Sequence, residues 1–134
     1  MLPRVRFPRL LWLLLIPGLA GTVGFGADTA AVATRELSFE RDVRPILKKN
    51  CFQCHGEGEK LKGGLDLRLR RFMVAAGEDG RFPVVPGKPS ERELVLLLRE
   101  GEMPKKAKPL PPAQIAIIEQ WVAQGAKTLR PEPE

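Results

Sequence analysis

The chain carries the stretch Cys51-Phe52-Gln53-Cys54-His55, which holds its only two cysteines and its only histidine. The pattern C-x-x-C-H is the attachment signal for a c-type haem. In that chemistry each thiol adds across one vinyl group of the haem, and the adjacent imidazole binds the iron. Two residues between the thiols let a short turn span both vinyl groups. The motif therefore predicts one covalent haem c at Cys51 and Cys54, with His55 as an iron ligand.

Three other interpretations of the two cysteines fit the sequence less well. A redox dithiol of the thioredoxin kind needs a βαβ context, and the chain shows no strand pattern. A structural zinc site needs four ligands, whereas this motif supplies three. A disulfide across two residues is a strained and weak staple for a fold. Haem attachment is the interpretation that accounts for the whole motif.

The second iron ligand has to come from another residue type, because the chain has no second histidine. A methionine thioether is the usual alternative. Met73 lies in an apolar helical stretch, where a methionine typically fills core space. Met103 follows a helix stop and precedes Pro104, so we expect it to reach the iron from a loop. The alternatives are an open sixth position or a lysine from the loop, namely Lys105, Lys106 or Lys108.

The N-terminal region has the features of a secretory signal peptide. Three arginines lie within the first nine residues, an apolar run follows at 10–20, and Ala31-Val32-Ala33 offers a cleavage site. The run is shorter than the roughly 20 residues of a membrane span. We expect residues 1–33 to be removed, which leaves no transmembrane span and predicts a periplasmic or secreted protein. The alternative is an uncleaved membrane anchor.

The remaining chain is short and only mildly basic. Removing residues 1–33 leaves 101 residues and a net charge of +4. This length predicts one haem domain at 34–128, followed by a disordered tail at 129–134. The charges are mixed along the chain, so we expect no nucleic-acid partner. They form either an ordinary solvated surface or a weakly basic face that steers docking to an acidic redox protein. We expect a monomer.

Hydrophobic periodicity predicts helices and no strands. A first helix is expected over 38–50, with the regular part starting near Asp42 because Pro45 is tolerated only in a first turn. A short helix should follow and end near Gly77. Ser90-Glu91-Arg92-Glu93 reads as a capping box before a helix that stops at Gly101. A last helix is expected over 112–124. The fold class is therefore all-α, with three to four helices and long loops.

Six stretches between residues 38 and 126 occur in a characteristic order. They are Phe39-Glu40-Arg41-Asp42-Val43-Arg44-Pro45-Ile46-Leu47, Asn50-Cys51-Phe52-Gln53-Cys54-His55-Gly56, Lys62-Gly63-Gly64-Leu65, Val85-Pro86-Gly87-Lys88-Pro89-Ser90, Met103-Pro104 and Ile117-Ile118-Glu119-Gln120-Trp121-Val122-Ala123-Gln124-Gly125-Ala126. In this order the chain resembles a class I-type cytochrome c, and more narrowly the planctomycete-type cytochrome c domain. The resemblance implies a small cytochrome c-like fold wrapped around one covalent haem, with His55 and Met103 as axial ligands.

These features predict an electron-transfer protein rather than an enzyme. We expect a monohaem c-type cytochrome that carries single electrons outside the cytoplasmic membrane between redox protein partners. One alternative is a haem sensor in which the sixth iron position is open. Another is an electron-entry subunit of a larger secreted oxidoreductase. The sequence shows no second group of residues arranged for catalysis.

Overall fold

The computed structural model describes residues 35–77, 79–91 and 93–134, and this part of the chain is helical, with no strand. The predicted signal peptide at 1–33 lies outside the described residues. The all-α prediction is confirmed for the described part. Its elements in chain order are η1 (Phe39–Val43), α2 (Arg44–Asn50), η2 (Lys62–Gly64), α3 (Arg70–Val74), η3 (Pro89–Glu91), α4 (Glu93–Arg99) and α5 (Pro112–Ala123).

The first helix begins as a wide turn and becomes regular further along. Its first five residues form the π-helical turn η1, and α2 continues directly from it. Pro45 lies in the first turn of α2, where a missing N–H breaks no helical hydrogen bond. The looser start expected before a regular helix is therefore confirmed. Phe39, Val43 and Leu47 form the buried face of this helix.

The start of α4 differs from the prediction. Ser90 lies within the 3-10 turn η3, and α4 begins only at Glu93. No hydrogen bond joins Ser90 to Glu93 among the described residues, so the predicted capping box is not formed. Pro89, which has a fixed φ, opens its own tight turn and takes Ser90 into it. The predicted stop is confirmed, since Gly101 has a φ of 70° after the end of α4.

Helix α5 ends in a Schellman motif at the predicted glycine. Gly125 has a φ of 96°, which a residue with a side chain rarely adopts. The Gly125 N–H donates to the Val122 carbonyl at 3.0 Å, and the Ala126 N–H donates to the Trp121 carbonyl at 2.9 Å. These bonds satisfy two of the last carbonyls of α5 and turn the chain back towards η1.

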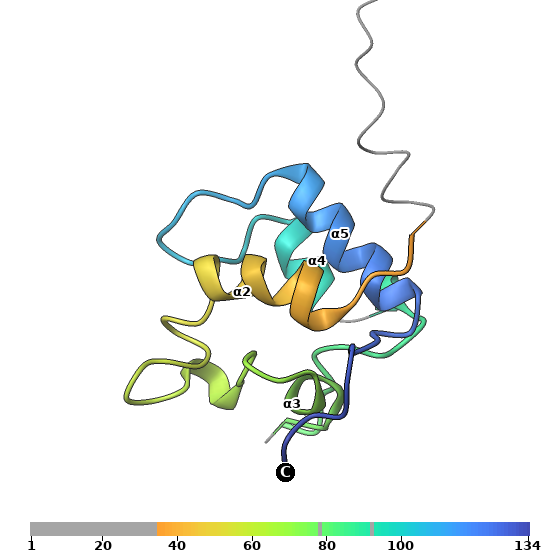
Figure 1. Cartoon of the computed structure of the whole chain (residues 1–134). Helices are drawn as coiled ribbons and strands as arrows, with labels where there is room; N and C mark the ends of the chain where they lie inside the picture. The colour runs from red at the N-terminus through yellow and green to blue at the C-terminus, as the bar shows by residue number, and fades with distance from the viewer. Residues whose placement is uncertain (1–34, 78, 92) are drawn as a thin grey trace, which may run out of the picture.

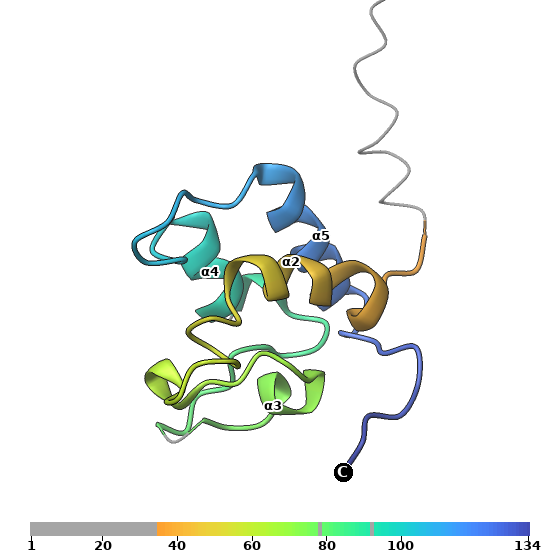
Figure 2. The same ribbon diagram turned by 60° about the vertical axis from the view of Figure 1, so that its left-hand side comes forward.

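The hydrophobic core lies where η1 and α2 meet α4 and α5. Trp121 on α5 is fully buried, and its ring centroid lies 5.8 Å from that of Phe39 on η1. Figures 1 and 2 both show α2, α4 and α5 grouped together, with α3 and its flanking loops on the other side of α2. Among the described residues, no helix combines the length and the apolar character needed to cross a membrane.

The two ends of the described chain are joined by hydrogen bonds. The Leu37 N–H donates to Gln124 Oε1 at 2.7 Å, and the Phe39 N–H donates to the Lys127 carbonyl at 2.9 Å. The indole N–H of Trp121 donates to the same carbonyl at 2.8 Å. The segment before η1 is therefore fixed on the segment after α5.

The C-terminal tail continues from this junction to α3. The carboxylate of Glu132 accepts hydrogen bonds from the backbone N–H groups of Arg70, at 2.5 Å, and Arg71, at 2.7 Å. These are the first two residues of α3, whose N–H groups have no partner within the helix. Residues 129–134 are expected to form a disordered tail, and this stays a prediction; in the structure the segment makes this acidic cap and a hydrogen bond from the Leu129 N–H to the Glu40 carboxylate at 2.8 Å. The boundary at residue 128 stays a prediction.

Candidate haem site

Helix α2 delivers the two cysteines on a single turn. The N–H groups of Cys51 and Phe52 both donate to the Leu47 carbonyl, at 2.8 and 3.1 Å, and thereby end the helix. The N–H groups of Cys54 and His55 then both donate to the Cys51 carbonyl, at 3.0 and 2.9 Å. The C-x-x-C-H motif is therefore one hydrogen-bonded turn directly after α2, as attachment of both thiols to a single group requires.

Phe52 fixes this turn on the protein. Its side chain is 1% exposed and belongs to the core, and the guanidinium of Arg44 lies 5.8 Å from the ring centroid. Cys54, two residues on, is exposed, and Cys51 is half-buried against the core. The two thiols therefore lie at the boundary between core and surface, where a large apolar group can be bound partly out of water.

Both cysteines are free, which excludes a disulfide between them in this structure. The described residues also hold no group of three or more His, Cys, Asp and Glu side chains placed to bind a metal ion. The thiols remain available for two thioether bonds.

Burial keeps Cys51 in its neutral form. Loss of hydration, followed by the neighbouring Cys54, raises the pKa of the Cys51 thiol to about 11. Redox-active cysteines have the opposite property, a lowered pKa that makes them thiolates near neutral pH. The Cys51 thiol is therefore protonated near neutral pH and does not itself have the lowered pKa of an attacking thiolate.

His55 has a free imidazole next to the two thiols. Its Nδ1 atom is buried and has no hydrogen-bond partner among the described residues. Its backbone carbonyl accepts the N–H of Leu67 at 2.9 Å, which holds the end of the motif on the segment before α3. Buried polar atoms are normally satisfied, so an unpartnered ring nitrogen beside two free thiols fits a histidine that binds a metal. The three motif residues therefore fit a haem c.

Met103 lies in the loop between α4 and α5 and is half-buried against the core. Its N–H donates to the Leu97 carbonyl at 3.1 Å. Figures 1 and 2 both show this loop beside the C-terminal end of α2, which leads into the cysteine turn. Met73 is fully buried in the core, as the sequence predicts. Of the two methionines, Met103 is the one that lies in a loop and is only partly buried, and its role as an iron ligand stays a prediction.

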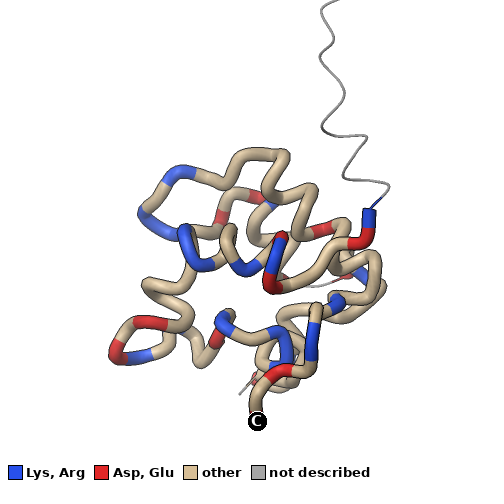
Figure 3. The backbone as a smooth tube through the Cα atoms, viewed as in Figure 1, with Lys and Arg blue, Asp and Glu red and all other residues tan. Residues whose placement is uncertain are grey.

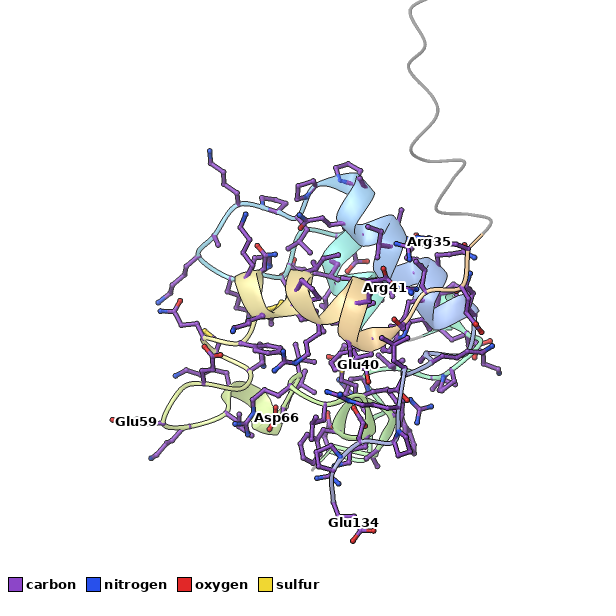
Figure 4. The ribbon with its side chains drawn as sticks, in the orientation of Figure 1. Arg35, Glu40, Arg41, Glu59, Asp66 and Glu134 are labelled. Atoms are coloured by element: carbon purple, nitrogen blue, oxygen red, sulfur yellow. The ribbon has the colours of Figure 1, made fainter. Side chains whose placement is uncertain are left out.

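A pair of charged residues that the sequence did not reveal packs against Gly56, directly after the motif. A Cβ added to Gly56 would lie 2.7 Å from Cγ of Arg68, so the arginine stem occupies the space of a side chain at that position. Asp66 holds Arg68 in place through an ion pair of 2.7 Å, and this hydrogen bond lowers the pKa of Asp66. Figure 4 shows Asp66 on the segment that lies below α2. The only sequence signal was the glycine directly after His55.

Compared with known protein families, residues 51–107 match the model described as planctomycete cytochrome C. The matched segment contains all four predicted site residues, Cys51, Cys54, His55 and Met103. No curated protein and no solved structure matches the chain significantly.

Proposed function

Since the chain carries a planctomycete-type cytochrome c domain at residues 51–107, we propose that it is a monohaem electron carrier of the periplasm or the exterior. Cytochrome c domains generally act in electron transfer, which gives the class of function. The finer statements, namely one haem, its covalent attachment and the location, are the proposal. They are supported by the single C-x-x-C-H turn and the signal-like N-terminus.

The observation that carries the proposal is that the C-x-x-C-H side chains have none of the partners that would occupy them otherwise within the described residues. Two free thiols lie on one turn, next to a histidine whose buried Nδ1 meets no hydrogen-bond partner in the described part of the chain. Bound haem supplies the chemistry, which is one-electron cycling between ferric and ferrous iron.

The protein's own residues have three roles in this proposal. Cys51 and Cys54 hold the cofactor covalently, and His55 and Met103 ligate the iron. A thioether ligand raises the reduction potential relative to a second histidine. The buried side chains of the first and last helices exclude water and so disfavour the extra charge of the ferric state.

The first experiment is the spectroscopy of protein produced with c-type haem maturation machinery. We expect a pyridine haemochrome with one c-type haem per chain, and an oxidised spectrum with the weak far-red band of a methionine–ferric haem. Absence of covalent haem contradicts the proposal. Covalent haem without that band, together with carbon monoxide binding, supports the sensor alternative. Fractionation of cells that produce the full chain tests the location.

The two methionines allow a matched test of the sixth ligand. Met103→Ala should abolish the far-red band and lower the reduction potential, because the thioether that stabilises ferrous iron is lost. Met73→Leu conserves volume in the core and should leave both the band and the potential close to the wild type. Spectra and redox titrations of the two variants provide the comparison. A band that survives in Met103→Ala would remove Met103 from the site.

A further inference from the structure

The segment at residues 62–68 holds the last two residues of the cysteine turn by their main chain. The Lys62 N–H donates to the Cys54 carbonyl at 2.9 Å, and the Leu67 N–H donates to the His55 carbonyl at 2.9 Å. We call residues 62–68 the strap. Figures 1 and 2 both show the chain leaving the end of α2 and returning below it along this segment. The strap therefore restrains both a predicted haem-attachment residue and a predicted iron ligand.

The far end of the strap is anchored by one core residue and one ion pair. Leu67 is buried and belongs to the hydrophobic core. The carboxylate of Asp66 accepts the Arg68 Nε–H at 3.0 Å, an Nη2 hydrogen at 2.7 Å and the Arg68 backbone N–H at 2.9 Å. In Figure 3 an acidic and a basic position lie close together on this segment, where Figure 4 labels Asp66. Because both carboxylate oxygens are used, the guanidinium of Arg68 is held in one orientation.

This orientation of Arg68 places its stem against the main chain directly after His55. Gly56 is buried, and a Cβ there would lie 2.7 Å from Arg68 Cγ and 3.0 Å from Arg68 Cδ. A side chain at residue 56 and the Arg68 stem therefore cannot both fit unless one of them moves. The Arg68 side chain is 49% exposed, so water screens its charge, and it is the packed stem that acts on the motif.

The restraint on the main chain bears on the orientation of the His55 ring. In metal-binding histidines a hydrogen bond at the second ring nitrogen usually fixes the plane of the ring. Within the described residues the buried Nδ1 of His55 has no such partner, so the orientation of the ring depends on the main chain that carries it. That main chain is held at residue 55 by the Leu67 hydrogen bond and at residue 56 by the Arg68 stem.

We propose that Arg68, held by Asp66, is a positioning residue that fixes the orientation of the His55 ring on the haem iron. This inference rests on the proposed electron-carrier function and adds the residues that orient its histidine ligand. The plane of an axial imidazole decides how the unpaired electron of ferric iron is distributed over the haem ring. Arg68 therefore tunes the electronic state of the haem, and does so only through His55.

Proton NMR of the ferric holoprotein measures this orientation, because the shifts of the haem methyl groups follow the plane of the axial ligand. Arg68→Ala removes the stem and the ion pair together and should move the haem methyl resonances. Gly56→Ala keeps every charge but displaces the stem, so it should move them as well. Unchanged haem methyl resonances in both variants would overturn the proposal.

Arg81→Ala is the matched control, because Asp79 and Arg81 form the same kind of turn away from the strap. The Arg81 N–H donates to Asp79 at 2.9 Å, as the Arg68 N–H does to Asp66, and both Asp79 and Arg81 are exposed. The control removes the same charge and should leave the haem methyl resonances at their wild-type positions. Equal movement in Arg81→Ala and Arg68→Ala would count against positioning, since loss of charge alone would explain both.

Amide hydrogen exchange separates positioning from a general loss of stability. In Arg68→Ala the Leu67 amide should exchange about tenfold faster, whereas the Ala126 amide at the end of α5 should keep its wild-type rate. Equal acceleration of both amides would assign the effect to global stability and overturn the proposal. The combination of Gly56→Ala with Arg68→Ala should change the resonances by less than the sum of the single effects, because both changes act on one contact.

Failure of the proposed function gives a different result from failure of this inference. Wild-type protein that matures without covalent haem would contradict the electron-carrier function and this inference with it. Covalent haem with unchanged methyl resonances in the variants would overturn only the role of Arg68. If Arg68→Ala does not mature, the comparison of Gly56→Ala with Arg81→Ala decides the question alone.

Discussion

Asp42 fixes the wide first turn of the opening helix. Its carboxylate is 4% exposed and accepts the Ser38 N–H at 2.8 Å and a guanidinium hydrogen of Arg35 at 2.7 Å. Figure 4 labels Arg35 and Arg41 near the start of the opening helix. Burial raises the pKa of Asp42, but the hydrogen bonds from Arg35, Ser38 and Arg41 outweigh it and lower the pKa to about 2. The ionised carboxylate therefore stabilises the folded state.

The contribution of Asp42 should depend on pH in a defined window. Because its folded pKa lies below the ordinary 3.8, its contribution is complete above that pH and disappears as the pH falls towards 2. Asp42→Asn should lower the free energy of unfolding of the holoprotein by about 1 kcal/mol at neutral pH, with solvent screening taken into account. Urea titrations of both proteins should converge near pH 2. The exposed Asp79→Asn serves as control, and a gap between wild type and Asp42→Asn that does not depend on pH would contradict this role.

The residues of the candidate site divide clearly into those that the sequence reveals and those that it conceals. Cys51, Cys54 and His55 are predictable because their chemistry requires adjacent positions. Met103 stays a prediction, because the lack of a second histidine favours a methionine but leaves a loop lysine or an open position as alternatives. Arg68 was missed because its cover over Gly56 depends on a contact across the turn, and no spacing rule encodes that contact.

At the level of the elements, α3 depends most on the rest of the chain. It has five residues, Arg70–Val74, and so is far too short to be stable alone. Glu132 satisfies its first two N–H groups, and the Nε–H of Arg70 donates to the Ala126 carbonyl at 3.0 Å. The tail thereby supports the segment that places Met73 in the core.

Removal of the Glu132 carboxylate should therefore weaken the whole domain. We expect Glu132→Ala to cost about 1 kcal/mol of unfolding free energy, as the loss of a helix cap usually does. Glu134→Ala, an exposed change two residues further on, should have no measurable effect. The midpoints of urea unfolding of the two holoprotein variants provide the test. Equal urea midpoints for Glu132→Ala and Glu134→Ala would mean that the Glu132 carboxylate contributes nothing to stability.

Local sequence signals predicted where the helices begin and end, but not the contacts that the helices make with distant residues. The π turn before α2 and the end of α5 follow from Pro45 and Gly125, whose backbone preferences act over a few residues. The cap on α3 comes from a residue 62 positions away, so no window of sequence contains it. The false capping box has a local cause, since Pro89 started a turn that took in Ser90.

For the molecule as a whole, the core is small for a chain of this length. The described part has sixteen buried hydrophobic residues, from Leu37 to Ala126. A covalent haem stays attached when the chain unfolds, so it stabilises the folded state through the apolar surface that it buries and the iron–ligand bonds that form only there. A covalent haem of the size of several side chains should therefore be a major part of the domain's stability.

Production of the chain with and without c-type haem machinery tests this dependence. We expect the haem-free chain to unfold at a temperature lower by ~10 °C or more than the holoprotein. Circular dichroism at a helix wavelength follows both transitions. A variant with Cys51→Ser and Cys54→Ser, matured under the same conditions, should resemble the haem-free chain. Equal midpoints for all three proteins would show that the cofactor is not needed for stability.

The hydrogen bonds that join residues 37 and 39 to residues 124 and 127 have a consequence for biosynthesis. A ribosome makes the chain from its N-terminus, so the cysteine turn emerges roughly 70 residues before the partner of η1 exists. Until then the first helix has no Trp121 to pack against. The proposed attachment of haem to Cys51 and Cys54 would therefore meet the cysteine turn before the segment after α5 completes the packing of the first helix.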